Sequence, residues 1–426
     1  MKLLLALLCV IELLLGTYLS GVAGPYLSPL LFLGTSFAIA FLYLRMSARP
    51  QWVSLSIIKV PAVAVTAAQW ALFAGISYFI ISKLKFLWWY HLMYHFPEGS
   101  SDIIPQIQTL AQRFLAGEQP YNGIQFSDYV LYPTYMPFQW LPYIPLELLH
   151  KDYRWLPAIA LLGASFYYFI SKRKMEGNIL LQLLVPVWPM LVWCVSILYD
   201  NNTFIFTVEG LIAAYYLFAA ESIGRKNLAA LAIGIGLCLF SRYSIVFWVP
   251  LCLSLFYIAG EKKKAFWLAG TALLFFVVFY WWPFLRQDAT IFINGYNYHT
   301  HAALDEWVRD KAINGHNYLN NGLGFTSYAI AWFPGDLAHQ LANYKNTLFG
   351  ICLLTVALLA FFYYRTRNSL SLQTYMLFSF KIYIAVFYAF IQIPYRYLYL
   401  TPLVVSAALL GGAFFPRPVK DNTILE

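Results

Sequence analysis

"TLFGICLLTVALLAFFYY", residues 347–364, is the stretch that decides the fold of this chain. It contains no charged residue and is followed directly by Arg365. A helix needs about 20 mostly apolar residues to cross the hydrocarbon core of a bilayer. We therefore expect this segment to be a membrane-spanning helix.

The composition of the whole chain agrees with this interpretation. Hydrophobic residues make up 61% of the 426 residues and charged residues only 11%, and the mean hydropathy is +0.62. Soluble domains carry about 25% charged residues, so a soluble class is excluded. We expect an all-α polytopic membrane protein, a single integral domain over 1–426, with about twelve spans near 3–20, 26–44, 57–82, 154–171, 179–198, 203–220, 228–240, 244–259, 265–283, 347–364, 375–393 and 397–415.

Two of these apolar stretches are short. The segments 228–240 and 244–259 are separated by "SRYS" (241–244), so they are either two tilted spans or one broken helix. Broken helices at membrane depth are found where they line protein or water. Within the first segment, "AIGIG" (232–236) is typical of close helix packing.

Lysine and arginine predict the orientation, since cytoplasmic loops are enriched in both. With the N-terminus inside, the inner loops collect 16 of the 28 basic residues: Lys2, Arg45, Arg49, Lys59, Lys172, Arg173, Lys174, Arg225, Lys226, Lys262, Lys263, Lys264, Arg365, Arg367, Arg417 and Lys420. The net charge of +9 is therefore a membrane-topology signal, and no nucleic-acid partner is expected.

Two long segments, 83–153 and 284–346, then fall on the outer side. All seven histidines and 12 of the 19 acidic residues lie there or at the outer interface. Because histidine titrates near neutral pH, any proton-transfer chemistry is expected on the outer face. The acidic residues Glu12 and Glu209 fall inside apolar spans, and the sequence suggests no role for either.

The first outer segment contains "SSDIIPQIQTLAQRFLAGEQPY" (100–121). Its apolar residues recur at spacings of three and four, which predicts an amphipathic helix that ends near Gly117. Beside a span, such a helix is expected to lie in the membrane interface. Asp102 directly precedes the helix, so it is either an N-cap or a functional acid.

Several motifs taken together resemble the GT-C membrane glycosyltransferases, most closely glycosyltransferase family 87. They are the early outer aspartate, "GEQPY" (117–121), "YPTYMPF" (132–138) and "YRYLYLTPL" (395–403). The resemblance implies a GT-C-like bundle with interfacial helices in its outer loops. It also implies a polyprenyl-phosphate sugar donor, a mannose-like hexose, and Asp102 as the catalytic base. The chain departs from the family pattern at "YDNNTF" (199–204) and at Arg242, where a lysine is frequent.

Transfer from a lipid phosphate requires a base for the acceptor hydroxyl and cations for the leaving phosphate. Asp128 is the alternative base, although it also fits a simple turn. Arginines bordering short apolar spans are costly there and are usually functional or paired, although they can also reach out to the headgroups. The candidate substrate-binding residues are Arg242, Arg396, His299, His301, His316, Tyr121 and Asp128.

No cofactor or metal is expected. "HLMYH" (91–95) has a spacing that zinc can use, but no acidic or cysteine ligand accompanies it. The expected partners are the donor, a lipid or glycan acceptor and membrane lipids, with the site facing the periplasm from a bacterial inner membrane. The alternatives are a transporter or flippase, which predicts paired charges at mid-membrane, and an O-antigen ligase or polymerase.

Overall fold

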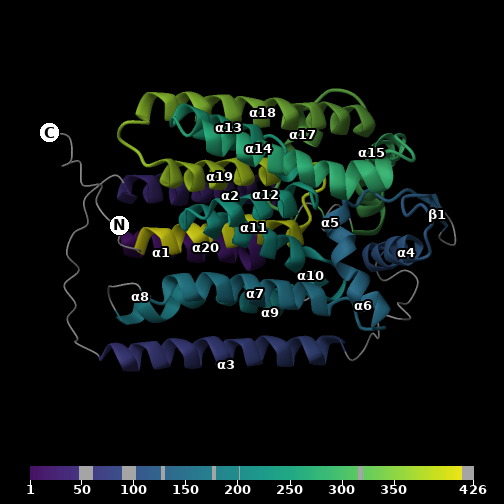
Figure 1. Cartoon of the computed structure of the whole chain (residues 1–426). Coiled ribbons are helices and arrows are strands. Elements are labelled where there is room, and N and C mark those ends of the chain that lie inside the picture. The colour runs from purple at the N-terminus through teal and green to yellow at the C-terminus, as the bar shows by residue number, and fades with distance from the viewer. Residues whose placement is uncertain are drawn as a thin grey trace.

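The computed structural model describes residues 1–47, 61–88, 102–125, 130–174, 179–200, 202–314, 319 and 321–414. Helices run side by side in one bundle, with the N-terminus at one end and the elements α4 (Ile103–Leu115), β1 (Ile124–Gln125), α6 (Ile144–Leu148) and α15 (Ile291–Asn314) at the other, which we name the loop end (Figure 1). Within the described residues, seven helical segments are long and apolar enough to cross a membrane: Lys2–Ser47, Ala62–Lys85, Ile179–Tyr199, Lys262–Leu285, Leu337–Thr366, Leu372–Ala389 and Arg396–Phe414.

The bundle helices follow the chain in order. They are α1 (Lys2–Leu14), η1 (Leu15–Leu19), α2 (Ser20–Ser47), α3 (Ala62–Trp88), α7 (Trp155–Lys172), α8 (Ile179–Leu184), η4 (Val185–Val187), α9 (Trp188–Tyr199), α11 (Glu209–Gly224), α12 (Leu228–Leu239), α13 (Trp248–Ile258), α14 (Lys262–Phe276), η6 (Val277–Leu285), α18 (Leu337–Thr366), α19 (Leu372–Ala389) and α20 (Leu400–Phe414). The sequence ranges expected near 154–171 and 203–220 are helical as α7 and α11, but neither is among the seven apolar segments.

Shorter elements connect these helices at the loop end. They are α4 (Ile103–Leu115), β1 (Ile124–Gln125), β2 (Val130–Leu131), α5 (Pro137–Trp140), η3 (Leu141–Tyr143), α6 (Ile144–Leu148), α10 (Asn202–Ile205), η5 (Tyr243–Ile245), α15 (Ile291–Asn314), α17 (Thr326–Trp332) and η7 (Arg396–Tyr399). The two strands form one antiparallel pair, with Ile124 opposite Leu131.

The centre of the bundle is formed by α11, α19 and α20, which pack against one another. In the most apolar stretches of α19 and α20, 89% and 83% of the residues are buried, against 11% in α3 and 22% in α18. Lipid is as apolar as a protein core, so peripheral spans can keep large apolar side chains exposed. α11 also approaches α12 closely, because a Cβ on Gly234 would lie 2.9 Å from Ala219 Cα. The close packing predicted for "AIGIG" is thereby confirmed.

The first 47 residues form a hairpin. Two spans were expected here, and the helical run bends at Gly24, whose φ of +76° lies in the region that favours glycine. The bend lets α1 pack against α2 and brings Ser36 to the Glu12 carboxylate. Lys381 of α19 forms a 2.5 Å salt bridge with the same carboxylate, and both side chains are completely buried. Glu12, which had no assignable role from sequence, therefore links α1 to α2 and α19, and it also accepts from Ser406 of α20.

The predicted amphipathic helix is present as α4, with Ile104, Ile107 and Leu110 on its buried face. This face packs against α5, η3 and α6, so protein contacts cover it where we expected the membrane interface to do so. Three of the four prolines of 132–149, namely Pro137, Pro142 and Pro145, stand in the first turns of α5, η3 and α6, where proline suits a helix start. α4 is thus held firmly at the loop end.

Candidate functional site

Four elements that are distant in sequence meet around Tyr135, which precedes α5. Asp102 at the start of α4, Glu209 at the start of α11 and Arg242 after α12 are all close enough for their charges to act on the Tyr135 hydroxyl. Burial raises its pKa well above the usual range, the two acids raise it further, and Arg242 opposes them. Tyr298 of α15 also raises the pKa of Tyr135. The structure therefore gathers two of the predicted site residues, Asp102 and Arg242, in one place.

Asp102 occupies the N-cap position of α4, but its side chain makes no capping hydrogen bond. Its main-chain carbonyl accepts the first helical bond, from the Gln106 amide at 3.0 Å. Apart from a contact with its own main chain, the carboxylate has no hydrogen-bond or salt-bridge partner among the described residues. The capping explanation therefore does not account for this side chain, which is left available for another task.

The surroundings of Asp102 disfavour its ionised form. Its side chain is accessible to water, yet desolvation by the protein around it raises the pKa of the carboxyl, outweighing its backbone hydrogen bond and the positive charge of Arg309 on α15. A carboxylate with a raised pKa holds a transferred proton more readily, as a general base at neutral pH requires. Structural ion pairs also shift pKa values. The absence of a capping bond from the Asp102 side chain is therefore stronger evidence for a functional role than its pKa is.

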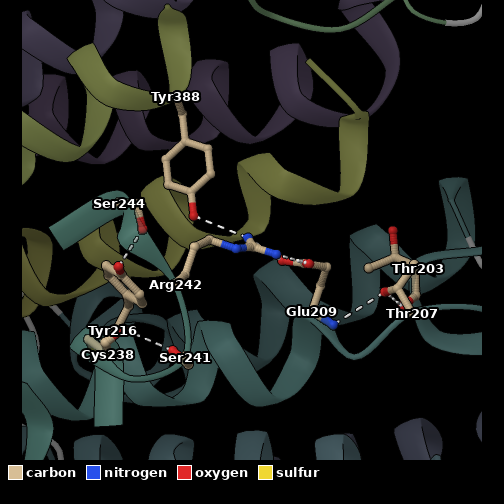
Figure 2. A network of polar contacts seen from close by, with 9 residues as sticks. All are labelled: Thr203, Thr207, Glu209, Tyr216, Cys238, Ser241, Arg242, Ser244 and Tyr388. Carbon is tan, nitrogen blue, oxygen red and sulfur yellow. Dashed lines mark hydrogen bonds and ion pairs between the residues drawn. The ribbon is translucent and has the colours of Figure 1, made fainter. Parts of the chain in front are cut away.

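Arg242 is bound by protein. Its Nη1 donates to Glu209 Oε2 at 2.9 Å and to the Tyr388 hydroxyl at 3.2 Å, and its Nη2 donates to Glu209 Oε1 (Figure 2). The break after α12 puts the guanidinium there, while Glu209 is the first residue of α11, where the helix dipole favours an acid. This ion pair, which has two hydrogen bonds, therefore joins the start of α11 to the break that follows α12.

Hydrogen-bonded hydroxyl groups lie near both residues of this pair. The Thr207 hydroxyl accepts from the Glu209 amide at 3.2 Å, and the Tyr216 and Ser244 hydroxyls are hydrogen-bonded at 2.5 Å (Figure 2). Sequence reasoning placed Glu209 in a span without a role. The sequence did contain a signal for this pairing, because an arginine in a short apolar stretch is expected to pair with a carboxylate at the same depth in the membrane.

Arg396, in contrast, has no acidic partner among the described residues. Its Nε donates to the Asn321 carbonyl at 3.3 Å, and the part of the chain that the structure describes offers it no salt bridge. Its Nη2 lies 3.3 Å from where a Cβ on Gly21 would be, so glycine leaves space for the guanidinium beside the N-terminal hairpin. Its half-buried cation is therefore available to an anionic ligand.

The two arginines are linked through a pair of tyrosines. Tyr399, one turn after Arg396, donates from its hydroxyl to the Tyr388 carbonyl at 3.1 Å, and the two rings lie 6.3 Å apart. Tyr388 in turn accepts from Arg242. The N-terminal end of α20 and the Arg242 break therefore belong to one connected region of the loop end.

The remaining predicted residues lie elsewhere. Tyr121 is buried in an aromatic cluster, where its hydroxyl accepts from Trp140 Nε1 at 3.1 Å and its ring packs on Phe284. His299 and His301 are accessible to water on α15, yet desolvation by the protein around His299, together with the charge of Lys345, lowers its pKa. Asp128, His316 and "HLMYH" lie outside the described residues.

No group of three or more His, Cys, Asp or Glu side chains in the described ranges is arranged to hold a metal ion. Several acids are instead paired with cations, as Glu209 is with Arg242. The chain matches no protein-family model, no curated protein and no solved structure, so its chemistry rests on this geometry.

Proposed function

We propose that this chain is a GT-C type membrane glycosyltransferase. It moves a mannose-like hexose from a polyprenyl-phosphate sugar to a lipid- or glycan-linked acceptor. The bundle crosses a bacterial inner membrane with about twelve spans, counting short helices such as α12 and α13, and the loop end faces the periplasm. The observation that supports this most is the Asp102 carboxylate, which makes no capping bond and whose charge, like those of Glu209 and Arg242, acts on the Tyr135 hydroxyl.

In the proposed reaction, Asp102 accepts the proton of the acceptor hydroxyl. The acceptor oxygen forms a bond to the anomeric carbon while the bond from that carbon to the phosphate oxygen breaks. Polyprenyl phosphate leaves, and its developing negative charge requires a cation. Arg396 suits this task better than Arg242 does, because Arg242 is already neutralised by Glu209.

Each residue of this scheme has its own place. Arg242 and Glu209 join the end of α12 to the start of α11. Tyr121 holds the turn after α4 through its hydrogen bond with Trp140. Apolar side chains on the surfaces of the peripheral helices suit the isoprenoid chain of the donor. One displacement of this kind inverts the configuration at the anomeric carbon.

The test uses purified protein with radiolabelled polyprenyl-phosphate sugars. We expect transfer by the wild type and its loss in Asp102→Asn. Asp336→Asn is the matched control, since Asp336 is also exposed and precedes a helix of the loop end. Transfer by Asp102→Asn at the wild-type rate would refute the catalytic assignment.

A transporter or flippase is the second candidate, and the buried pair of Glu12 and Lys381 favours it. Paired charges deep in the bundle are what a transport site predicts. This pair is closed off, however: Lys381 also donates to the Pro402 carbonyl at 3.1 Å, and Ser36 and Ser406 donate to Glu12. Turnover of none of the donors, with lipid flipping in vesicles, would decide for the transporter; turnover of only a lipid-linked polysaccharide would decide for a ligase or polymerase.

A further inference from the structure

Helix α15 carries a second polar cluster on the side that faces away from Asp102. Tyr298 of α15 faces Tyr132, with ring centroids 6.5 Å apart. Tyr296 and Thr300 are each two residues from Tyr298, which places them roughly 160° around the helix. They face α18, where Lys345 meets them. This cluster is thus separate from the Asp102 region.

Lys345 is held in a defined position. Its Nζ donates to Thr300 Oγ1 at 2.9 Å and lies 3.5 Å from the centroid of the Tyr296 ring. The Thr300 hydroxyl donates to the Tyr296 carbonyl at 3.0 Å, so its oxygen is free to accept from the lysine. A lysine that merely reaches for the headgroups is flexible, whereas this one is aimed by two contacts.

The charge of Lys345 has no counter-ion in the part of the chain that the structure describes. Among the described residues no carboxylate lies within salt-bridge distance of its ammonium group. One of its three N–H donors is used by Thr300, and two remain. His299, exposed next to Thr300, is close enough for the lysine charge to act on it. An ammonium group beside an imidazole is suited to bind phosphate oxygens.

The position of Lys345 along α18 indicates which kind of phosphate compound fits. It stands just before the uncharged stretch 347–364, and therefore at the level where a bilayer core would begin. Phe349 and Leu353 follow at spacings of four and eight on the same face, with 40% and 53% of their surface exposed. A phosphate at Lys345 would leave an attached apolar chain lying along these two side chains.

We propose that Lys345, aimed by Thr300 and assisted by His299, binds the phosphate of an anionic membrane lipid at the edge between α15 and α18. The lipid chain packs on Phe349 and Leu353. Because α15 also carries Tyr298 towards Tyr135, a bound lipid steadies one wall of the Asp102 region. This site does not depend on the proposed reaction.

The experiment measures lipid retained by the full-length protein. Purified protein is placed in phosphatidylcholine nanodiscs with a minority of phosphatidylglycerol, and bound phosphatidylglycerol is counted by native mass spectrometry after release. We expect Lys345→Met to retain one phosphatidylglycerol fewer, with binding about fivefold weaker, as is typical for one lysine near an anionic surface. Thermal unfolding, measured alongside, shows that the variant is folded.

Lys262→Met is the matched control. Lys262 also lies over a tyrosine ring, 4.9 Å from the centroid of Tyr257, but it is the first residue of α14 and has no hydroxyl acceptor among the described residues. Equal retention in wild type and Lys345→Met, or equal losses in both variants, would overturn the proposal. Displacement of the lipid by millimolar inorganic phosphate, with phosphate itself bound, would overturn the assignment of a lipid.

Discussion

The guanidinium of Arg242 binds the carboxylate of Glu209 through both of its terminal nitrogens, whereas among the described residues Arg396 binds only a main-chain carbonyl. Both arginines were equal candidates for the donor phosphate in the sequence. The difference between them leads to the first prediction.

Arg242→Lys should destabilise the protein and Arg396→Lys should not. Lysine cannot make the two-pronged contact, and the loss of one hydrogen bond to a charged group costs about 1.5–3 kcal/mol. Thermal unfolding in detergent measures this. In the transfer assay, Arg396→Lys should raise the KM for the donor with the unfolding temperature unchanged. A stable Arg242→Lys with a raised KM would exchange the two roles.

Asp102→Ala and Asp336→Ala should have different effects on stability. Asp336 caps α18, accepting from the His339 amide at 2.9 Å, and the loss of such a cap typically costs about 0.5–2 kcal/mol. Asp102 accepts no capping bond, and its removal relieves a desolvated charge. Asp102→Ala should therefore unfold at the wild-type temperature or above it. A fall equal to that of Asp336→Ala would restore the capping explanation.

The rate of transfer should fall on the acid side as Asp102 becomes protonated. Because burial raises the pKa of this carboxyl, the fall should occur above the range usual for aspartate. The positive charge of Arg309 lowers that pKa, so Arg309→Gln should move the acid limb to higher pH. Rate profiles of the two proteins in one buffer series measure the shift. An unmoved limb would assign it to another group.

Glu12→Leu and Lys381→Met should each destabilise the bundle strongly. Each leaves one buried charge without its partner, which costs about 3–5 kcal/mol. The double variant Glu12→Leu with Lys381→Met should recover much of the loss, because an apolar pair of similar volume can replace a buried ion pair. The unfolding temperatures of the wild type, the two single variants and the double variant complete a double-mutant cycle. If the double variant is stable but inactive in lipid flipping, the transporter is favoured.

Gly322→Ala should be far more harmful than Gly34→Ala. A Cβ on Gly322 would lie 1.7 Å from the Pro394 carbonyl oxygen, two residues before Arg396, whereas a Cβ on Gly34 would meet nothing within 4 Å. The first substitution must move the backbone that carries Arg396. We expect lower thermal stability and a raised donor KM. Gly34→Ala, within α2, should be neutral or stabilising by up to about 1 kcal/mol.

The sequence alone determined that the chain is an all-helical protein with long apolar segments, because the cost of leaving backbone groups unpaired in lipid permits few alternatives. It also determined α4, whose apolar spacing is a local property of residues 103–115. The break around "SRYS" was visible for the same reason, since a charge interrupts an apolar run.

Only the tertiary structure decided which charges are engaged. Glu12 and Lys381 are 369 positions apart, and no local pattern states that they meet. The packing of the helices decides three further features. It pairs Arg242 with Glu209, it leaves Arg396 without an acidic partner among the described residues, and it leaves Asp102 without a capping bond. Local periodicity fixes the face that a side chain occupies. Its partner is fixed by contacts between distant segments, which come into being only when the bundle closes.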